Sequence, residues 1–104
     1  MSSSMKVATR NELPPGGKKL VEIDGRAIAV FNVDGSYYAI DDVCTHDGGP
    51  LAEGELIGSE IECPRHGARF DVQTGRPLCM PAIEPVAVHA VELRGDDVYV
   101  ATND

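Results

Sequence analysis

Two short segments of the chain carry side chains that are typical metal ligands. One residue separates Cys44 from His46, and two residues separate Cys63 from His66. Each segment therefore supplies one soft thiolate and one imidazole, and both groups bind transition metals. Glycine and proline residues surround both pairs. Glycine lets the backbone come close to a bound metal and proline restricts the backbone conformation, so we predict stiff loops in place of a helix. We expect the four side chains to converge on one small metal centre.

These four residues allow three interpretations. The first is a structural zinc site, although zinc modules usually keep roughly two to four residues between paired cysteines and three to five between paired histidines. The second is a two-iron, two-sulfide cluster, with Cys44 and Cys63 on one iron and His46 and His66 on the other. The third is that the histidines are unrelated surface residues and the cysteines are simply buried. The spacing is atypical of zinc but leaves all three open.

The rest of the chain is expected to form a scaffold of short strands. Asp24-Gly25 and Asp34-Gly35 predict tight hairpin turns. Residues 76–85 contain three prolines and are expected to form an ordered loop. No segment shows a helical period, and short strands with frequent turn signals predict an all-β sandwich or barrel. The predicted strands span residues 7–10, 18–23, 27–33, 36–40, 59–62, 68–72, 86–93 and 98–101.

The 104 residues are expected to form a single domain. Strands from both ends of the chain, at about residues 5–42 and 80–104, would build a base. A small subdomain at about residues 43–79 would be inserted into it and would hold the ligand loops. A rigid sheet that carries inserted loops is a common way to keep a loop site in a fixed geometry.

The composition excludes several classes of function. Seventeen acidic and nine basic residues give a net charge of −8, which argues against binding to nucleic acid or to an anionic membrane. This charge suits either attraction to a basic protein face or a well-solvated surface. No apolar run approaches the ~20 residues of a membrane span, and no signal peptide is evident, so we expect a cytoplasmic protein. Three cysteines argue against a disulfide framework.

The paired motif resembles that of the Rieske family. Sixteen residues lie between the Cys-x-His and Cys-x-x-His motifs, and glycine closely follows each one. Residues 63–71 (CPRHGARFD) are very similar to the second cluster loop of that family. The resemblance covers nearly the whole chain. It implies an antiparallel β-sandwich base with a small cluster-binding subdomain, and one [2Fe-2S] cluster per chain, bound by Cys44, His46, Cys63 and His66.

Four further positions indicate the subtype. High-potential family members carry an extra, disulfide-bonded cysteine in each loop, where this chain has Gly49 and Arg65. They also carry serine and tyrosine donors to the cluster where this chain has Ala68 and Phe70. Fewer donors stabilise the extra electron less, so we expect a potential toward the low end of the family's range of roughly −150 to +300 mV. This pattern resembles the soluble Rieske-type ferredoxins.

The resemblance implies an electron carrier that is not itself an enzyme. One electron at a time would pass from a flavin-dependent NAD(P)H reductase to a terminal oxygenase, each docking at the tip formed by His46 and His66. We expect a monomer. Alternative interpretations are a protein like the small subunit of assimilatory nitrite reductase, a Rieske domain serving another oxidoreductase, and a structural zinc or interaction module. The four intact ligand positions argue against the nitrite reductase subunit, because members of that family can lack them.

Other residues with chemical potential are given structural roles. Cys79 is expected to be a small buried hydrophobe, and His89 a packed structural histidine on a strand. Asp47 and Arg65 flank ligand histidines and are expected to be solvated, with docking as their alternative role. By resemblance, Pro81-Ala82 would belong to a proline loop that covers the cluster.

Overall fold

The computed structural model describes residues 4–43, 50–64, 67–79 and 84–102, and these form ten β-strands and no helix. The all-β class that the sequence predicts is confirmed. Among the described residues, no helix is long and apolar enough to cross a membrane. In chain order the strands are β1 (Ser4–Thr9), β2 (Lys18–Ile23), β3 (Arg26–Val33), β4 (Ser36–Asp41), β5 (Glu55–Ile57), β6 (Glu60–Glu62), β7 (Arg69–Asp71), β8 (Pro77–Cys79), β9 (Val88–Arg94) and β10 (Asp97–Ala101).

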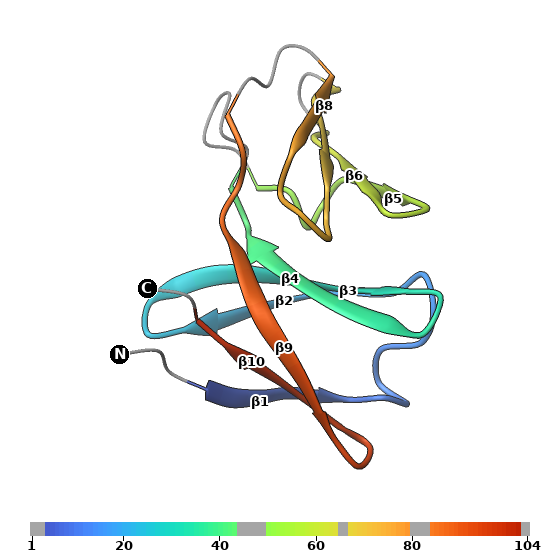
Figure 1. The fold of residues 1–104 in the computed structure, drawn as a ribbon, viewed down its shortest axis with the longest axis vertical. Helices are drawn as coiled ribbons and strands as arrows, with labels where there is room; N and C mark the ends of the chain where they lie inside the picture. Colours follow the sequence, from blue (N-terminus) through green and yellow to red (C-terminus); the bar gives the residue numbers. More distant parts are fainter. Residues whose placement is uncertain (1–3, 44–49, 65–66, 80–83, 103–104) are drawn as a thin grey trace.

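Six strands form the base in the order β1-β10-β9-β4-β3-β2, with every neighbouring pair antiparallel. The sheet consists of two three-stranded halves, which join where β4 pairs with β9. That junction contains two residue pairs, Ala39 with His89 and Ile40 with Val88. Figure 1 shows that β4 ends, and β9 begins, at the end of the base that faces the small sheet. The predicted meander of β2, β3 and β4 and the predicted hairpin of β9 and β10 are confirmed.

Both predicted Asp-Gly turns are present between the strands of the meander. Asp24 and Gly25 have φ angles of 52° and 79°, and Asp34 and Gly35 have angles of 52° and 93°. Positive φ at both central residues is the conformation of a two-residue hairpin whose twist matches that of the flanking strands. Aspartate tolerates this region better than most residues, and glycine enters it without steric cost.

Alternate residues of β3 contribute to two separate hydrophobic cores. Ile28 and Val30 enter the base core, which the two halves of the base sheet enclose. Ala29 and Phe31 enter the inter-sheet core, which lies between the base and the small sheet. Because successive strand side chains point to opposite faces, one strand supports both layers. The inter-sheet core contains Ala29, Phe31, Ile40, Leu51, Ile61, Cys63, Ala68, Phe70, Val72 and Val86.

The small sheet has the order β5-β6-β7-β8, and each neighbouring pair is antiparallel. In Figure 1 it lies at one end of the molecule, beyond the ends of β4 and β9. Ile61 of β6 and Phe70 of β7 are opposite each other and fully buried in the inter-sheet core. These side chains fasten the small sheet to the base.

Two strands of the small sheet depart from the sequence prediction. β5 is not predicted, because its three residues lie between Gly54 and Gly58 and carry no clear alternation. β8 forms inside the segment 76–85 that was expected to be a loop. Pro77 is its first residue and β8 is an edge strand, which is a position where a residue without an N–H is tolerated. Pairing with β6 and β7 therefore overrides weak local signals.

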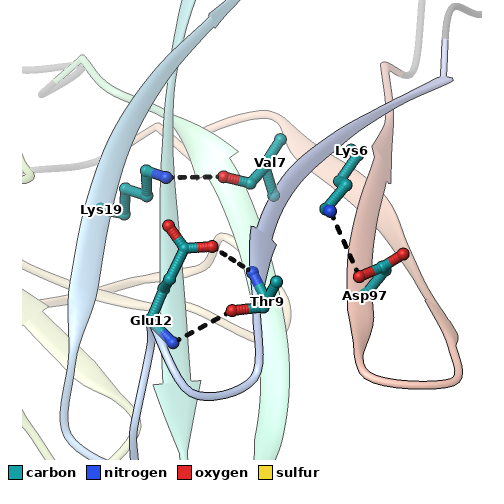
Figure 2. Close-up of polar contacts among 6 residues, drawn as sticks. All are labelled: Lys6, Val7, Thr9, Glu12, Lys19 and Asp97. Carbon is teal, nitrogen blue, oxygen red and sulfur yellow. Dashed lines mark hydrogen bonds and ion pairs between the residues drawn. The ribbon is translucent and has the colours of Figure 1, made fainter.

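Polar contacts close the two edges of the base sheet against each other (Figure 2). The register of β1 against β10 shifts at Val7. The Nζ of Lys19, on β2, donates a hydrogen bond of 2.7 Å to the Val7 carbonyl oxygen. A lysine from one edge strand thus satisfies a carbonyl of the other, so that both edges are less open to pairing with another chain.

A reciprocal pair of hydrogen bonds fixes the turn after β1. The Thr9 N–H donates to Glu12 Oε1 at 2.8 Å, and the Glu12 N–H donates to Thr9 Oγ1 at 3.4 Å (Figure 2). Hydrogen bonds from the backbone and side chain of Thr9, followed by the charge of Lys19, lower the pKa of Glu12 below its ordinary value of 4.5.

We expect Glu12→Gln to reduce the pH dependence of folding stability. A carboxylate with a lowered folded-state pKa stabilises the protein above its unfolded pKa, and this contribution is lost as the pH falls through the folded value. The free energy of unfolding in urea should therefore differ between wild type and variant at neutral pH, and the difference should shrink as the pH falls below the ordinary glutamate pKa and through the lowered one. A constant difference across this range would contradict the assignment.

We expect Gly54→Ala to destabilise the protein far more than Gly58→Ala, although both residues flank β5. A methyl group at residue 54 would lie 1.8 Å from the Glu62 carbonyl oxygen, whereas one at residue 58 has nothing within 4 Å. Gly58 has a φ of +62°, so alanine there should cost only about 1–2 kcal/mol. Gly54→Ala should exceed about 3 kcal/mol because backbone must move. Equal losses in urea unfolding would contradict the packing described.

Candidate functional site

The first ligand segment begins directly after β4. Cys44 and His46 lie outside the described residues, but the residues on both sides of the segment are described. The Asp42 side chain accepts two hydrogen bonds through Oδ1, from the N–H of Leu51 at 2.7 Å and from the N–H of Ala52 at 2.6 Å. The start and the end of residues 43–50 are therefore tied together.

The second ligand segment is the tip of the β6–β7 hairpin. The Cys63 N–H donates to the Ala68 carbonyl oxygen at 2.6 Å, and the Gly67 N–H donates to the Cys63 carbonyl oxygen at 3.0 Å. Gly67 has a φ of +74°, so glycine is the residue that makes this return without strain. His66 lies outside the described residues. The backbone at Cys63 is nonetheless fixed from both sides.

Cys63 is buried at the base of this tip. It is 1% exposed, it is a free cysteine, and it packs in the inter-sheet core with Ala68 and Phe70. Those two neighbours are fully buried and carry no hydroxyl group. A thiolate in apolar surroundings needs compensation for its charge, which a coordinated metal supplies. A buried cysteine sulfur on a hairpin with a fixed backbone thus fits an iron–sulfur cluster.

Carboxylates next to Cys63 have other partners. Arg69 Nε lies 3.1 Å from Glu62 Oε2, and Arg69 Nη1 lies 3.8 Å from Glu60 Oε1, on neighbouring strands. Within the described part of the chain, no group of three or more histidine, cysteine or acidic side chains could hold a metal ion. Cys63 is therefore the one predicted ligand among the described residues. The glutamates of β6 do not form a metal site with it.

The chain that follows β8 leaves the small sheet at the end where Cys63 lies. The strand register places Glu62, Arg69 and Cys79 in one row across β6, β7 and β8. The chain returns to the base where the Val86 N–H donates to the Gly75 carbonyl oxygen at 2.9 Å. A methyl group on Gly75 would lie 2.1 Å from the Val86 carbonyl oxygen, so glycine permits this close contact.

The remaining predicted residues divide between described and undescribed parts. His89 is 3% exposed, and its Nε2 lies 2.7 Å from Asp41 Oδ1, as expected for a packed structural histidine. Other predictions lie outside the described part of the chain: those for Asp47, Arg65, Pro81-Ala82 and the side chain of Cys79.

Sequence reasoning missed the two aspartates at the end of β4. Asp41 pairs with His89 of β9, and Asp42 binds the backbone after the first ligand segment. Asp41 is the last residue of β4 and Asp42 follows it, and the two carboxylates have different partners. The only available signal was their place three and two residues before Cys44, since the partners of Asp42 lie nine and ten residues away.

Comparison with known proteins identifies this arrangement. The model of the Rieske [2Fe-2S] domain family matches residues 3–92. The chain is 40% identical over 89 residues to the ferredoxin component of the naphthalene 1,2-dioxygenase system of Pseudomonas aeruginosa, covering 86% of each protein. It is 42% identical over 98 residues to ferredoxin CarAc of Metapseudomonas resinovorans, covering 93% of this chain and 92% of the relative.

Solved structures show the same fold over nearly the whole chain. The ferredoxin of carbazole 1,9a-dioxygenase from Nocardioides aromaticivorans IC177 matches with a TM-score of 0.92 and 37% identity, covering 97% of this chain and 99% of the other. A chain from the complex of reduced oxygenase and oxidized ferredoxin in carbazole 1,9a-dioxygenase matches with a TM-score of 0.91 and 40% identity, covering 94% and 92%. This chain belongs to the Rieske [2Fe-2S] domain family and is related within it to the ferredoxins of dioxygenase systems.

Proposed function

We propose that this chain carries single electrons to the terminal oxygenase of a multicomponent dioxygenase system. The observation that carries this proposal is the similarity to ferredoxin components over almost the full length of both proteins. One relative forms a complex with its oxygenase, which supports direct docking between the two proteins. The matching family model is that of a [2Fe-2S] domain, which supports an iron–sulfur cluster over zinc as the cofactor.

We propose that Cys44, His46, Cys63 and His66 bind this cluster. The buried free thiol of Cys63 on its fixed hairpin supports the assignment. When bound, the cluster accepts one electron and releases it. The protein contributes rigid backbone, an apolar surrounding for the sulfur ligands, and controlled access to the cluster. The small sheet, which spans β5 to β8, supports the proposal of a cluster-binding subdomain at about residues 43–79 on a base of about residues 5–42 and 80–104.

The surface around the ligand segments supports docking at this end. Val43 precedes the first segment and is 36% exposed, and Leu78 of β8 is 44% exposed. Pro64, beside Cys63, is also exposed. Apolar residues at the end of an acidic protein suit a partner with an apolar centre and a basic rim. The proposed partners at the His46 and His66 tip are the oxygenase and a flavin-dependent NAD(P)H reductase, each bound transiently by the monomer.

We expect the reduced protein to transfer its electron to a Rieske dioxygenase. The reduced protein, freed of dithionite, would be mixed without oxygen with the oxidised terminal oxygenase of carbazole 1,9a-dioxygenase, and absorbance would be followed by stopped flow. The expected result is reoxidation that saturates with oxygenase and slows as salt screens the acidic surface. Ferricyanide serves as the control acceptor. Reoxidation by ferricyanide, but by none of the carbazole, naphthalene and biphenyl oxygenases, would contradict the proposed function.

We expect Ala68→Ser to raise the reduction potential. Ala68 is fully buried beside Cys63 and offers no side-chain donor, so a serine hydroxyl there could stabilise the added electron. A hydrogen bond worth about 1 kcal/mol corresponds to roughly 40 mV for a one-electron couple. Ala29→Ser, which is fully buried in the same core but on β3 of the base, is the control in a redox titration. An unchanged potential in Ala68→Ser would contradict the view that missing donors keep the potential low.

A further inference from the structure

We propose that Asp42 is a positioning residue for the cluster, because its carboxylate closes the loop that carries Cys44 and His46. This inference rests on the proposed function and deepens it. Neither the ligand motif nor the similarity to other ferredoxins assigns this role. The proposal concerns geometry: Asp42 fixes the distance between the residues that come before and after these ligands in the sequence.

The Asp42 carboxylate makes this contact through two short hydrogen bonds. A single oxygen, Asp42 Oδ1, accepts hydrogen bonds from two successive backbone N–H groups, those of Leu51 at 2.7 Å and Ala52 at 2.6 Å. Hydrogen bonds to an ionised acceptor are stronger than neutral ones. They hold together the two ends of residues 43–50, so the loop loses the freedom that would otherwise oppose ligand convergence.

Asp42 is itself fixed to the base. Its N–H donates to the Ala27 carbonyl oxygen at 3.0 Å, and the N–H of Asp41 donates to the Ala87 carbonyl oxygen at 2.9 Å. The Asp41 side chain is paired with the buried His89. Backbone bonds to segments on either side therefore set the position from which the Asp42 carboxylate reaches the loop.

The other end of the contact is equally rigid. Leu51 is fully buried in the inter-sheet core, and its carbonyl oxygen accepts a hydrogen bond of 2.9 Å from the Gly54 N–H. The two N–H groups that Asp42 binds thus belong to an anchored turn. Fixed residues therefore stand on both sides of the proposed ligands in the sequence: Asp42 comes before Cys44 and His46, and Leu51 comes after them.

Proximity makes this closure relevant to the ligands. Cys44 is two residues from Asp42, so their Cα atoms are at most about 7 Å apart. Removing the carboxylate would leave two backbone N–H groups without their acceptor and would release one end of the loop. The loop could then exchange among conformations that do not place both ligands together, and the cluster would be lost more readily.

The test is the rate of cluster loss and the electron paramagnetic resonance (EPR) spectrum of loop variants prepared as holoproteins. Asp42→Ala removes the acceptor, Asp42→Glu keeps the charge but displaces the oxygen, and Asp42→Asn keeps an oxygen in place without the charge. Bleaching in the presence of a chelator should be at least about tenfold faster in the alanine and glutamate variants. Two charge-assisted hydrogen bonds contribute more free energy than a tenfold change in rate requires. The EPR g values of the alanine and glutamate variants should also shift or broaden. The asparagine variant keeps a weaker, neutral acceptor at the same place, so its bleaching rate should lie between those of wild type and Asp42→Ala and its g values should stay close to those of wild type.

Asp71→Ala is the matched control. Asp71 Oδ1 accepts a hydrogen bond of 2.8 Å from the Gln73 N–H, so this residue also fixes a turn of the small sheet, but not one that contains a proposed ligand. The control should keep the wild-type bleaching rate and g values. If Asp42→Ala does not accumulate as holoprotein, Asp42→Glu and Asp42→Asn still decide the question.

Two results would overturn the proposal. One is wild-type bleaching and g values in Asp42→Glu. The other is bleaching in Asp71→Ala as fast as in the Asp42 variants. Failure of the proposed function would look different: the Asp42 variants would behave as expected, while the wild-type protein would not reduce an oxygenase.

Discussion

The pairing of β4 with β9 is the contact on which the arrangement depends. The chain leaves the base after β4 and returns to it at β9, and these strands are joined by two residue pairs and by the His89–Asp41 contact. The small sheet is therefore inserted between two points that are held side by side. Its position follows from that junction and from the inter-sheet core, which connects its inner face to β3 and β4. A carrier that reacts by brief docking gains from such a rigid insertion, because little reorganisation accompanies each electron transfer.

Burial and exposure are divided in a way that suits this task. Cys63 lies in an apolar core at the end of β6, while the segment that contains Cys44 and His46 follows β4 of the base. Ala68 and Phe70 add apolar volume beside the sulfur but no hydroxyl donor. The outer carboxylates of β6 are paired with Arg69, so they contribute negative charge to the surface without competing for metal. The same short hairpin thus fixes a proposed ligand and shapes its electrostatic surroundings.

Sequence reasoning succeeded where a local requirement has a single chemical solution. The Asp-Gly turns need positive φ, and the Cys-x-His and Cys-x-x-His pairs have few other uses, so the meander and the Rieske family could be predicted directly. It failed where a long-range contact decides the structure. β5 and β8 exist because β6 and β7 offer edges to pair with, and the role of Asp42 depends on N–H groups nine and ten residues away. An aspartate before a ligand loop carries no local sign of which backbone groups it will bind.

The most direct test of the account is the identity of the metal centre in the wild-type protein. Iron, sulfide and zinc would be measured in the purified protein, together with its visible absorption and its low-temperature EPR spectrum after reduction with dithionite. The account predicts two irons and two sulfides per chain, a reddish-brown colour, and a rhombic signal with the low average g value of a cluster with histidine ligands. A colourless, EPR-silent protein that contains one zinc ion would contradict it.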